Sequence, residues 1–478
     1  MGNSGDGAHT GREKLKGNIG VFKLVCIVLA FNAPLGVVNG VVPLVLLGGI
    51  SGPLIFLGLG VFLLIFAVGM MAVAIRIPAS GGFYSFVTAG LGKIPGLAAS
   101  FTAILTYFCF LVVALAIGGV SYERFFVSMG APLIPWWVWA LVMGATTAIL
   151  GVLQIDFTGR ILAAVVVIEV VLVLIWEARV MQDGGATGRF TFESFDPALL
   201  TTGGLVMGVV FGFISLGGFE STSVYRDEAR DYKRTIPRAT YISIVVVTVF
   251  TAFATWVMVQ ALGTDGLAVI ADDPTAVFPA SVDSYAGRVA HDMVLLFIAT
   301  SSFAGMASLH NVTARYMFNL GRDGIIPRSL GRVHPKFGSP YVASIALSTA
   351  CFAILLGAIL TGQPGATLYT TTAGICGYSF VVLLLLASLG IAAYLMRTRL
   401  QELSVWTRIV APVFSAVAMV VIVVVVTTEI ELLTGTPTYA AIALTSVLAA
   451  IALGVIVGWV SKRWRPEVYQ LIGTQDEL

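Results

Sequence analysis

The chain has 478 residues, of which 58% are hydrophobic and only 11% are charged, and its formal net charge at pH 7 is +2. Soluble domains carry roughly 25% charged residues, so this composition excludes an ordinary soluble protein and indicates a polytopic membrane protein. The small positive charge does not indicate nucleic-acid binding, because the basic residues lie between apolar segments and set membrane topology.

Apolar segments of about 20 residues or more, the length needed to cross a bilayer, recur along the whole sequence. We predict twelve spans, at residues 19–47, 53–75, 95–121, 135–155, 160–181, 201–225, 237–262, 291–319, 339–361, 368–396, 405–428 and 437–461. With both termini in the cytoplasm, most of the 27 Lys and Arg residues fall inside, and the exceptions are Arg124, Arg179, Arg189 and Arg288. The positive-inside rule therefore supports an all-α protein with twelve transmembrane helices in the cell (plasma) membrane.

The first span is interrupted near its middle by Ala33, Pro34, Leu35 and Gly36. Proline removes a backbone donor and clashes with the preceding turn, and glycine lacks the side chain that favours a helix. Backbone groups freed at this depth are tolerated only where protein or a water-filled cavity satisfies them. We therefore expect a broken helix and a candidate binding segment. The run is too long for a signal peptide, so we expect it to remain as the first span.

The loop after the second span, residues 77–86, is rich in glycine and aromatic residues and can form either a short re-entrant segment or a tight turn. The third span carries Tyr107 near mid-depth, where it can cover a ligand or simply pack with one hydrogen bond.

Glu169 lies near the centre of the fifth span. A carboxylate there costs about 3 kcal/mol even on the lenient insertion scale, so an intramembrane acid is a functional-site hypothesis by default. The alternative is a protonated Glu169 that hydrogen bonds to a neighbouring helix and serves packing alone.

The sixth span contains the second interruption, where adjacent glycines and an acid replace the expected apolar residues. The candidate binding residues are Ser215, Leu216, Gly217, Gly218, Phe219 and Glu220. Broken helices at corresponding places of two halves indicate a transporter's binding site. We expect a bulky residue at Gly217 to block this site and the same change at Gly454, in the twelfth span, to be tolerated.

The eighth span holds three adjacent hydroxyl residues, Thr300, Ser301 and Ser302. Beside a broken helix they can form an oxygen-lined cation site, although such hydroxyls commonly bond to their own helix. His310 is expected to be a hydrogen-bonded structural group rather than a proton relay. Residues 263–290, before this span, form either an outer lid or a plain connector.

Spans one to five and six to ten have matching designs, because each set begins with a broken helix. An odd number of spans per unit forces the two units into opposite orientations, which gives a five-plus-five inverted repeat with two accessory helices. The predicted divisions are a cytoplasmic tail (1–18), the first repeat (19–181), the second repeat (201–396), two accessory spans (405–461) and a cytoplasmic tail (462–478).

Three motifs in this order carry a family resemblance: Gly218 to Glu220, the loop from Arg226 to Arg238, and the stretch from His310 to Pro327. Over roughly residues 17 to 460 the chain resembles the amino acid–polyamine–organocation permease superfamily. The resemblance implies the five-plus-five fold (the LeuT fold), substrate held between the first and sixth spans, and an aromatic gate at Phe219.

The chain departs from the family pattern in two places. Many members have a glycine-rich break in the first span, where this chain has Ala33 to Gly36. Some proton-coupled members place a lysine in the fifth span at the position of a sodium ion, and that position here is Glu169. The lysine mechanism therefore does not transfer. A carboxyl group shielded from water favours its neutral form, and Glu169 is the expected coupling group, for a proton in preference to sodium.

These features predict a secondary transporter that imports amino acids or related amines. Neutral amino acids are favoured because no basic residue lies at mid-depth to bind a second carboxylate, whereas Glu169 and Glu220 keep cationic amino acids and amines open. A sodium-coupled carrier, an exchanger and a non-transporting nutrient sensor are the alternatives. An enzyme is not predicted, since the four histidines are scattered. No cofactor, certain metal site or nucleic-acid partner is predicted, and the four cysteines are expected to be packing thiols.

Overall fold

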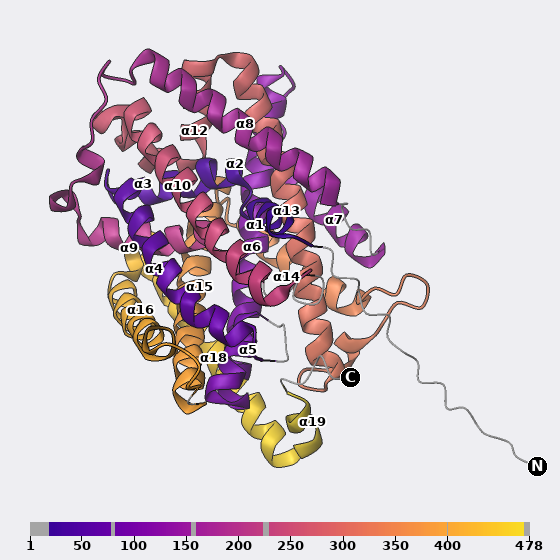
Figure 1. Cartoon of the computed structure of the whole chain (residues 1–478). Coiled ribbons are helices and arrows are strands. Elements are labelled where there is room, and N and C mark those ends of the chain that lie inside the picture. Colours follow the sequence, from indigo (N-terminus) through magenta and orange to yellow (C-terminus); the bar gives the residue numbers. More distant parts are fainter. Residues whose placement is uncertain (1–18, 78–81, 154–158, 223–228, 399, 473–478) are drawn as a thin grey trace, which may run out of the picture.

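A computed structural model describes residues 19–77, 82–153, 159–222, 229–398 and 400–472 of the chain (Figure 1). The predicted N-terminal tail, residues 1–18, and the last six residues of the predicted C-terminal tail lie outside the described residues. Parts of two loops noted in the sequence, residues 78–81 and 223–228, also lie outside them.

Helices make up almost all of the described chain. The first half contains α1 (Val21–Asn32), α2 (Pro34–Gly36), the π-helical turn η1 (Val37–Val41), α3 (Val42–Leu46), α4 (Gly52–Ala74), α5 (Phe83–Leu91), α6 (Lys93–Ser128), α7 (Trp136–Leu153) and α8 (Gly159–Asp183).

The second half begins with the short turns η2 (Glu193–Phe195) and η3 (Pro197–Leu199). It continues with α9 (Thr202–Leu216), α10 (Tyr232–Gly266), α11 (Ala268–Asp272), α12 (Pro274–Ala286), α13 (Arg288–Arg322), η5 (Arg328–Gly331), α14 (Tyr341–Leu360) and α15 (Gly365–Arg397). The chain then forms η6 (Trp406–Val410), α16 (Ala411–Thr428), α17 (Ile430–Thr434), α18 (Pro437–Trp464) and α19 (Pro466–Leu471).

The helices match the predicted spans one by one. Within the described residues, 11 helical segments are long and apolar enough to cross a membrane, and they correspond to every predicted span except the fifth. The fifth predicted span, residues 160–181, corresponds to α8, which has 25 residues. The prediction of an all-helical, multi-span protein is confirmed.

Several helices begin where polar residues satisfy their first amide groups. Thr201 accepts a hydrogen bond from the Gly204 amide at 2.9 Å and starts α9. Asp273 accepts from the Thr275 amide at 3.0 Å and starts α12, whose first residue is Pro274. A side-chain acceptor before the helix and a proline at its first position are favourable signals for a helix start.

The predicted outer stretch between spans seven and eight is largely helical, because it contains α11 and α12. Helix α12 packs against α8, α13 and η1. Trp176 of α8 donates a hydrogen bond to Ser281 of α12 at 2.9 Å, and Arg124 at the end of α6 pairs with Asp273. Figure 1 shows α12 and α19 at opposite ends of the molecule.

The two accessory helices lie against the bundle rather than in its middle. Helix α16 contacts α15 and α4, and α18 contacts α6. Exposed apolar residues on both helices, such as Val421 and Leu448, form surfaces suited to lipid.

The prediction that Gly454 tolerates a bulky residue is wrong. A Cβ atom at Gly454 of α18 would lie 2.5 Å from the Cα atom of Ala98 in α6. The two backbones approach so closely at this crossing that no side chain fits, as is common for small residues between membrane helices.

Candidate substrate and coupling site

The break predicted in the first span separates α1 from α2. Ala33 has φ 44° and ψ 78°, and it is the only non-glycine residue with positive φ among the described residues. Pro34 then starts α2, Leu35 is fully buried, and the short π-helical turn η1 follows Gly36. A left-handed residue followed by proline interrupts the hydrogen-bond ladder of the helix, so amide groups here need partners from elsewhere.

Glu169 supplies one of those partners from another helix. Its Oε2 atom accepts a hydrogen bond from the Leu35 amide at 3.3 Å, across 134 residues of sequence. The hydroxyl group of Ser301, in α13, lies beside the same carboxyl group, whose Oε1 atom has no hydrogen-bond partner among the described residues. Only 1% of Glu169 is exposed. The carboxyl group thus joins the broken first span, α8 and α13 at one buried point.

The other two hydroxyl residues of the predicted cluster are directed elsewhere. Thr300 donates to the carbonyl of Leu296 at 2.9 Å, and Ser302 donates to the carbonyl of Ile298 at 2.7 Å. Ser302 also lies beside Gly118 of α6, on the side of the third span. Both make the bonds to their own helix that membrane hydroxyls commonly make, so the structure brings only Ser301 to Glu169.

The break predicted in the sixth span follows the end of α9 at Leu216. Gly217 is extended, with φ −62° and ψ 179°, and Gly218 has φ 88°, a value that favours glycine. Residues 219–222 form one short turn before the gap in the described chain. Ser215 and Leu216 are buried, and the Ser215 hydroxyl bonds to a carbonyl one turn earlier at 2.9 Å.

Glu220 lies directly after this break and interacts with backbone amide groups of the break itself. Those groups belong to Gly218 and to Glu220. The phenol group of Tyr107, in α6, lies within electrostatic range of the Glu220 carboxyl group. The structure therefore brings Tyr107 to the sixth break.

Phe219 is 1% exposed and packs edge-to-face against Phe66 of α4, with ring centroids 6.2 Å apart. A leucine-sized substitution is therefore better suited to testing this residue than alanine, because removal of a buried phenylalanine side chain costs roughly 3–5 kcal/mol.

Two further buried groups were not predicted from the sequence. Glu177 of α8 is 3% exposed, and its Oε1 atom has no hydrogen-bond partner in the described part of the chain. Its spacing of eight residues from Glu169 places both acids on the same side of the helix. This spacing was the feature of the sequence from which Glu177 could have been predicted. Tyr316 of α13 lies within electrostatic range of Tyr107 and Tyr84, a proximity that the sequence did not indicate.

His310 has the surroundings of a structural histidine. It is 1% exposed, and its Nε2 atom is hydrogen bonded to Ser348 of α14 at 2.9 Å. Gly151 of α7 leaves room for the imidazole ring. His310 thus lies among α7, α13 and α14.

Similarity to known proteins extends over most of the chain. The family model for amino acid permeases matches residues 19–459. The low-affinity putrescine importer PlaP of Escherichia coli strain K12 is 24% identical over 298 residues, which are 60% of this chain and 64% of the importer. The match therefore spans less than two thirds of that relative. The branched-chain amino acid permease BcaP of Bacillus subtilis is 24% identical over 375 residues, 74% of this chain and 77% of that one.

A solved structure shows the same fold. The manganese transporter of Eremococcus coleocola, in complex with an aromatic bis-isothiourea substituted compound, aligns with a TM-score of 0.58 at 13% identity. The alignment covers 94% of this chain and 99% of the other. At this identity the likeness shows the fold alone, which is the five-plus-five inverted repeat that the sequence predicted.

Proposed function

The chain belongs to the amino acid permease family, and from this premise we propose that it imports neutral amino acids by alternating access, driven by a proton gradient. As a member of this family it is a multi-pass membrane transporter of amino acids or amines, and the relatives are permeases rather than enzymes. The substrate preference, the coupling ion and the binding residues form the proposal.

The substrate lies between the two breaks in this proposal. At the first break, the amide groups other than that of Leu35, which is bonded to Glu169, suit a carboxylate, and carbonyl groups near Gly217 suit an ammonium group. An α-amino acid presents both groups. Tyr107 and Glu220 lie next to the sixth break and are the side chains proposed to contact the substrate.

The hydrogen bond between Glu169 and the Leu35 amide is the observation that supports proton coupling. A charged carboxylate forms a hydrogen bond roughly twice as strong as a neutral acceptor does. Protonation of Glu169 therefore loosens the attachment of the first break to α8, and loss of the proton restores it. Because the first break also contributes to the substrate site, proton binding and substrate access become linked.

The relatives support two substrate classes. The name of the Escherichia coli relative specifies putrescine and that of the Bacillus subtilis relative specifies branched-chain amino acids. Putrescine is a diamine, and its two amino groups would make use of both Glu169 and Glu220. Branched-chain amino acids are neutral, which agrees with the absence of a basic residue among residues 33–36, 107 and 215–220. We favour the neutral amino acids, and amines are the second candidate.

An uptake panel in proteoliposomes tests this proposal. The parent protein, Glu169→Gln and the matched control Glu193→Gln, which alters an exposed acid on η2, are assayed with amino acids and amines under imposed proton or sodium gradients. Gln resembles the protonated side chain. Glu169→Gln should retain substrate binding and exchange but lose accumulation driven by a pH gradient.

Each outcome of the panel is informative. If Glu169→Gln still concentrates substrate when only a proton gradient is imposed, the coupling proposal is wrong. If sodium alone stimulates the parent protein, the coupling ion is sodium and Ser301 becomes a ligand beside Glu169. If no substrate in the panel is accumulated or exchanged by the parent, a nutrient sensor becomes the better assignment.

We further propose that both termini are cytoplasmic and that the repeats extend over residues 19–181 and 201–396, followed by the accessory spans. Exposed residues on the two faces allow a direct test. A cysteine at Asp272 should react with an impermeant thiol reagent in intact cells. A cysteine at Lys462 should react only after the membrane is permeabilised, and the reverse pattern would invert the topology.

A further inference from the structure

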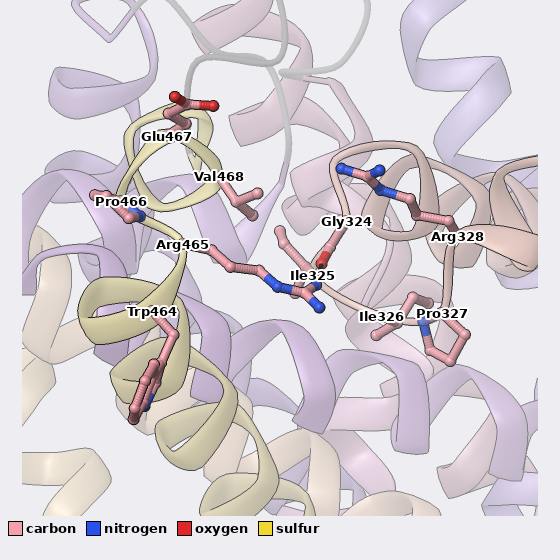
Figure 2. Close-up of a pocket in the computed structure, with 10 residues that line it drawn as sticks. All are labelled: Gly324, Ile325, Ile326, Pro327, Arg328, Trp464, Arg465, Pro466, Glu467 and Val468. Carbon is pink, nitrogen blue, oxygen red and sulfur yellow. Dashed lines mark hydrogen bonds between the residues drawn. The ribbon is translucent and has the colours of Figure 1, made fainter.

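A cavity of about 820 Å³ lies between α19 and the loop that follows α13, at the C-terminal end of the molecule (Figure 2). One wall is formed by the loop residues Gly324 to Arg328, and the other by Trp464 to Val468. None of the described residues that line it belongs to the broken first span or the broken sixth span. The cavity is therefore separate from the candidate substrate site.

Specific contacts hold the α19 wall of this cavity in place. Lys93, at the start of α6, donates hydrogen bonds to the carbonyls of Tyr469 at 3.1 Å and Gln470 at 2.6 Å. Ile472 is 1% exposed and packs in one apolar cluster with Leu97 and Leu320. The cavity thus has two fixed walls, because the segment after the last span is attached to both α6 and α13.

Two guanidinium groups enter the cavity from its opposite walls. Arg465 donates to the carbonyl of Gly324 at 3.3 Å, and the Arg328 side chain lies beside the same glycine. Arg328 has no hydrogen bond or ion pair to any residue that the structure describes. Figure 2 shows the carboxyl group of Glu467 directed away from both arginines. Paired guanidinium groups have the fixed, forked donors that match a phosphate group.

The position of the cavity indicates the source of that phosphate. Trp464 ends α18, is 75% exposed and lines the cavity. An exposed tryptophan at the end of a transmembrane helix is typical of the membrane interface. Leu453 and Ile456, exposed on the same helix, continue toward the lipid phase. The cavity consequently opens at the depth where phospholipid headgroups lie.

We propose that this cavity binds the phosphate group of an anionic phospholipid, with Arg328 and Arg465 as its ligands. The basic residues Lys462 and Arg463 beside it are exposed and add to the attraction for an anionic leaflet. The positive-inside rule places this face in the cytoplasmic leaflet, where anionic lipids are concentrated. The site is independent of the substrate and of the coupling ion.

Lipid titration of the purified full-length protein tests this proposal. In neutral detergent, native mass spectrometry measures binding of phosphatidylglycerol, of phosphatidylcholine with the same acyl chains, and of inorganic phosphate. The parent should bind phosphatidylglycerol preferentially. The double variant Arg328→Gln with Arg465→Gln should bind its tightest phosphatidylglycerol on the order of 30-fold more weakly. Arg463→Gln removes one charge from the same face, outside the cavity, and should retain that tight site.

Three results would overturn the proposal: unchanged phosphatidylglycerol affinity in the double variant, equal affinity of the parent for phosphatidylcholine, or an equal loss in Arg463→Gln. If inorganic phosphate binds as tightly as phosphatidylglycerol and competes with it, the lipid assignment is wrong and the ligand is a soluble phosphate. Arg328→Gln alone provides a second test if the double variant does not fold. It should weaken binding on the order of fivefold.

Discussion

The two broken helices are maintained by different means. At the first break, Ala33 adopts a left-handed conformation and the Leu35 amide is satisfied by Glu169 from α8, 134 residues away. At the sixth break, the residue with positive φ is Gly218. The acid that interacts with the backbone amides of Gly218 and Glu220 is Glu220 itself, two residues after Gly218. The first break depends on a tertiary contact, whereas the sixth is supported by its own sequence.

This difference indicates how the two halves can have different roles. A break supported by a distant, titratable residue changes when that residue changes its charge or when α8 moves. A break supported locally keeps its shape during such changes. We therefore expect the sixth break to act as the fixed half of the substrate site and the first break as the half that responds to the coupling ion.

The largest effect is expected from Gly217→Leu. A Cβ atom at this position already lies 3.3 Å from Phe380 and from two carbonyl oxygens of α9, so a leucine must move the break or fill the space beside it. Substrate binding should fall at least tenfold, measured by equilibrium binding to the purified protein. Gly217→Ala should have a small effect, since the φ of −62° suits any residue.

Gly357→Leu is the matched control for this substitution. Gly357 lies in α14, and no atom of the described residues lies within 4 Å of an added Cβ. Its substitution should leave binding unchanged. Binding by Gly217→Leu at the parental affinity would show that the fixed half of the site lies elsewhere.

The second prediction concerns the tertiary contact at the first break. Glu169→Ala removes the acceptor of the Leu35 amide, and the loss of a buried hydrogen bond costs about 1–3 kcal/mol. Hydrogen exchange at Leu35, followed by mass spectrometry, should accelerate roughly 5- to 150-fold. Glu220→Ala should accelerate exchange near residues 218–220 and leave Leu35 unchanged. Equal effects of both variants on Leu35 would remove the distinction between the breaks.

The spans and both breaks could be predicted from the sequence because their causes are local. Apolar runs of membrane length identify helices, and Pro34 or the pair Gly217 and Gly218 interrupts such a run wherever the run lies in space. Glu169 could likewise be recognised, since a central acid in an apolar span is costly.

The contacts of these residues could not be predicted, because they depend on how distant helices cross. Sequence alone gave no reason for Ser301, rather than Thr300 or Ser302, to reach Glu169. The failure at Gly454 has the same origin, since its closest neighbour is the backbone of Ala98 in another helix. Rotation about a helix axis decides which residue faces a partner, and the apolar periodicity of a membrane helix specifies that rotation weakly.

The third prediction tests whether the fixed break also closes over the substrate. Phe219→Leu should raise the apparent KM several-fold, because one aromatic contact contributes about 1 kcal/mol beyond its buried area. Phe66→Leu breaks the same edge-to-face pair from the side of α4 and is the control. If both variants raise the KM equally in uptake assays, the effect comes from the pair's packing, and Phe219 is not the gate.

The smallest effect is expected from Ala33→Gly, which gives the first break the residue type that the sixth already uses. A left-handed conformation costs a non-glycine residue roughly 1–2 kcal/mol, and part of this gain is offset by the greater freedom of glycine in the unfolded chain. The apparent Tm at a fixed heating rate should therefore rise by roughly 1–2 °C. Ala280→Gly, at an exposed position of α12, is the opposite case, because glycine in a helix interior is destabilising by about 1 kcal/mol. It should lower the Tm. If Ala33→Gly lowers the Tm as much as Ala280→Gly does, Ala33 carries no backbone strain. The first break would then lack the strain of a left-handed non-glycine residue, which the sixth break avoids by having Gly218.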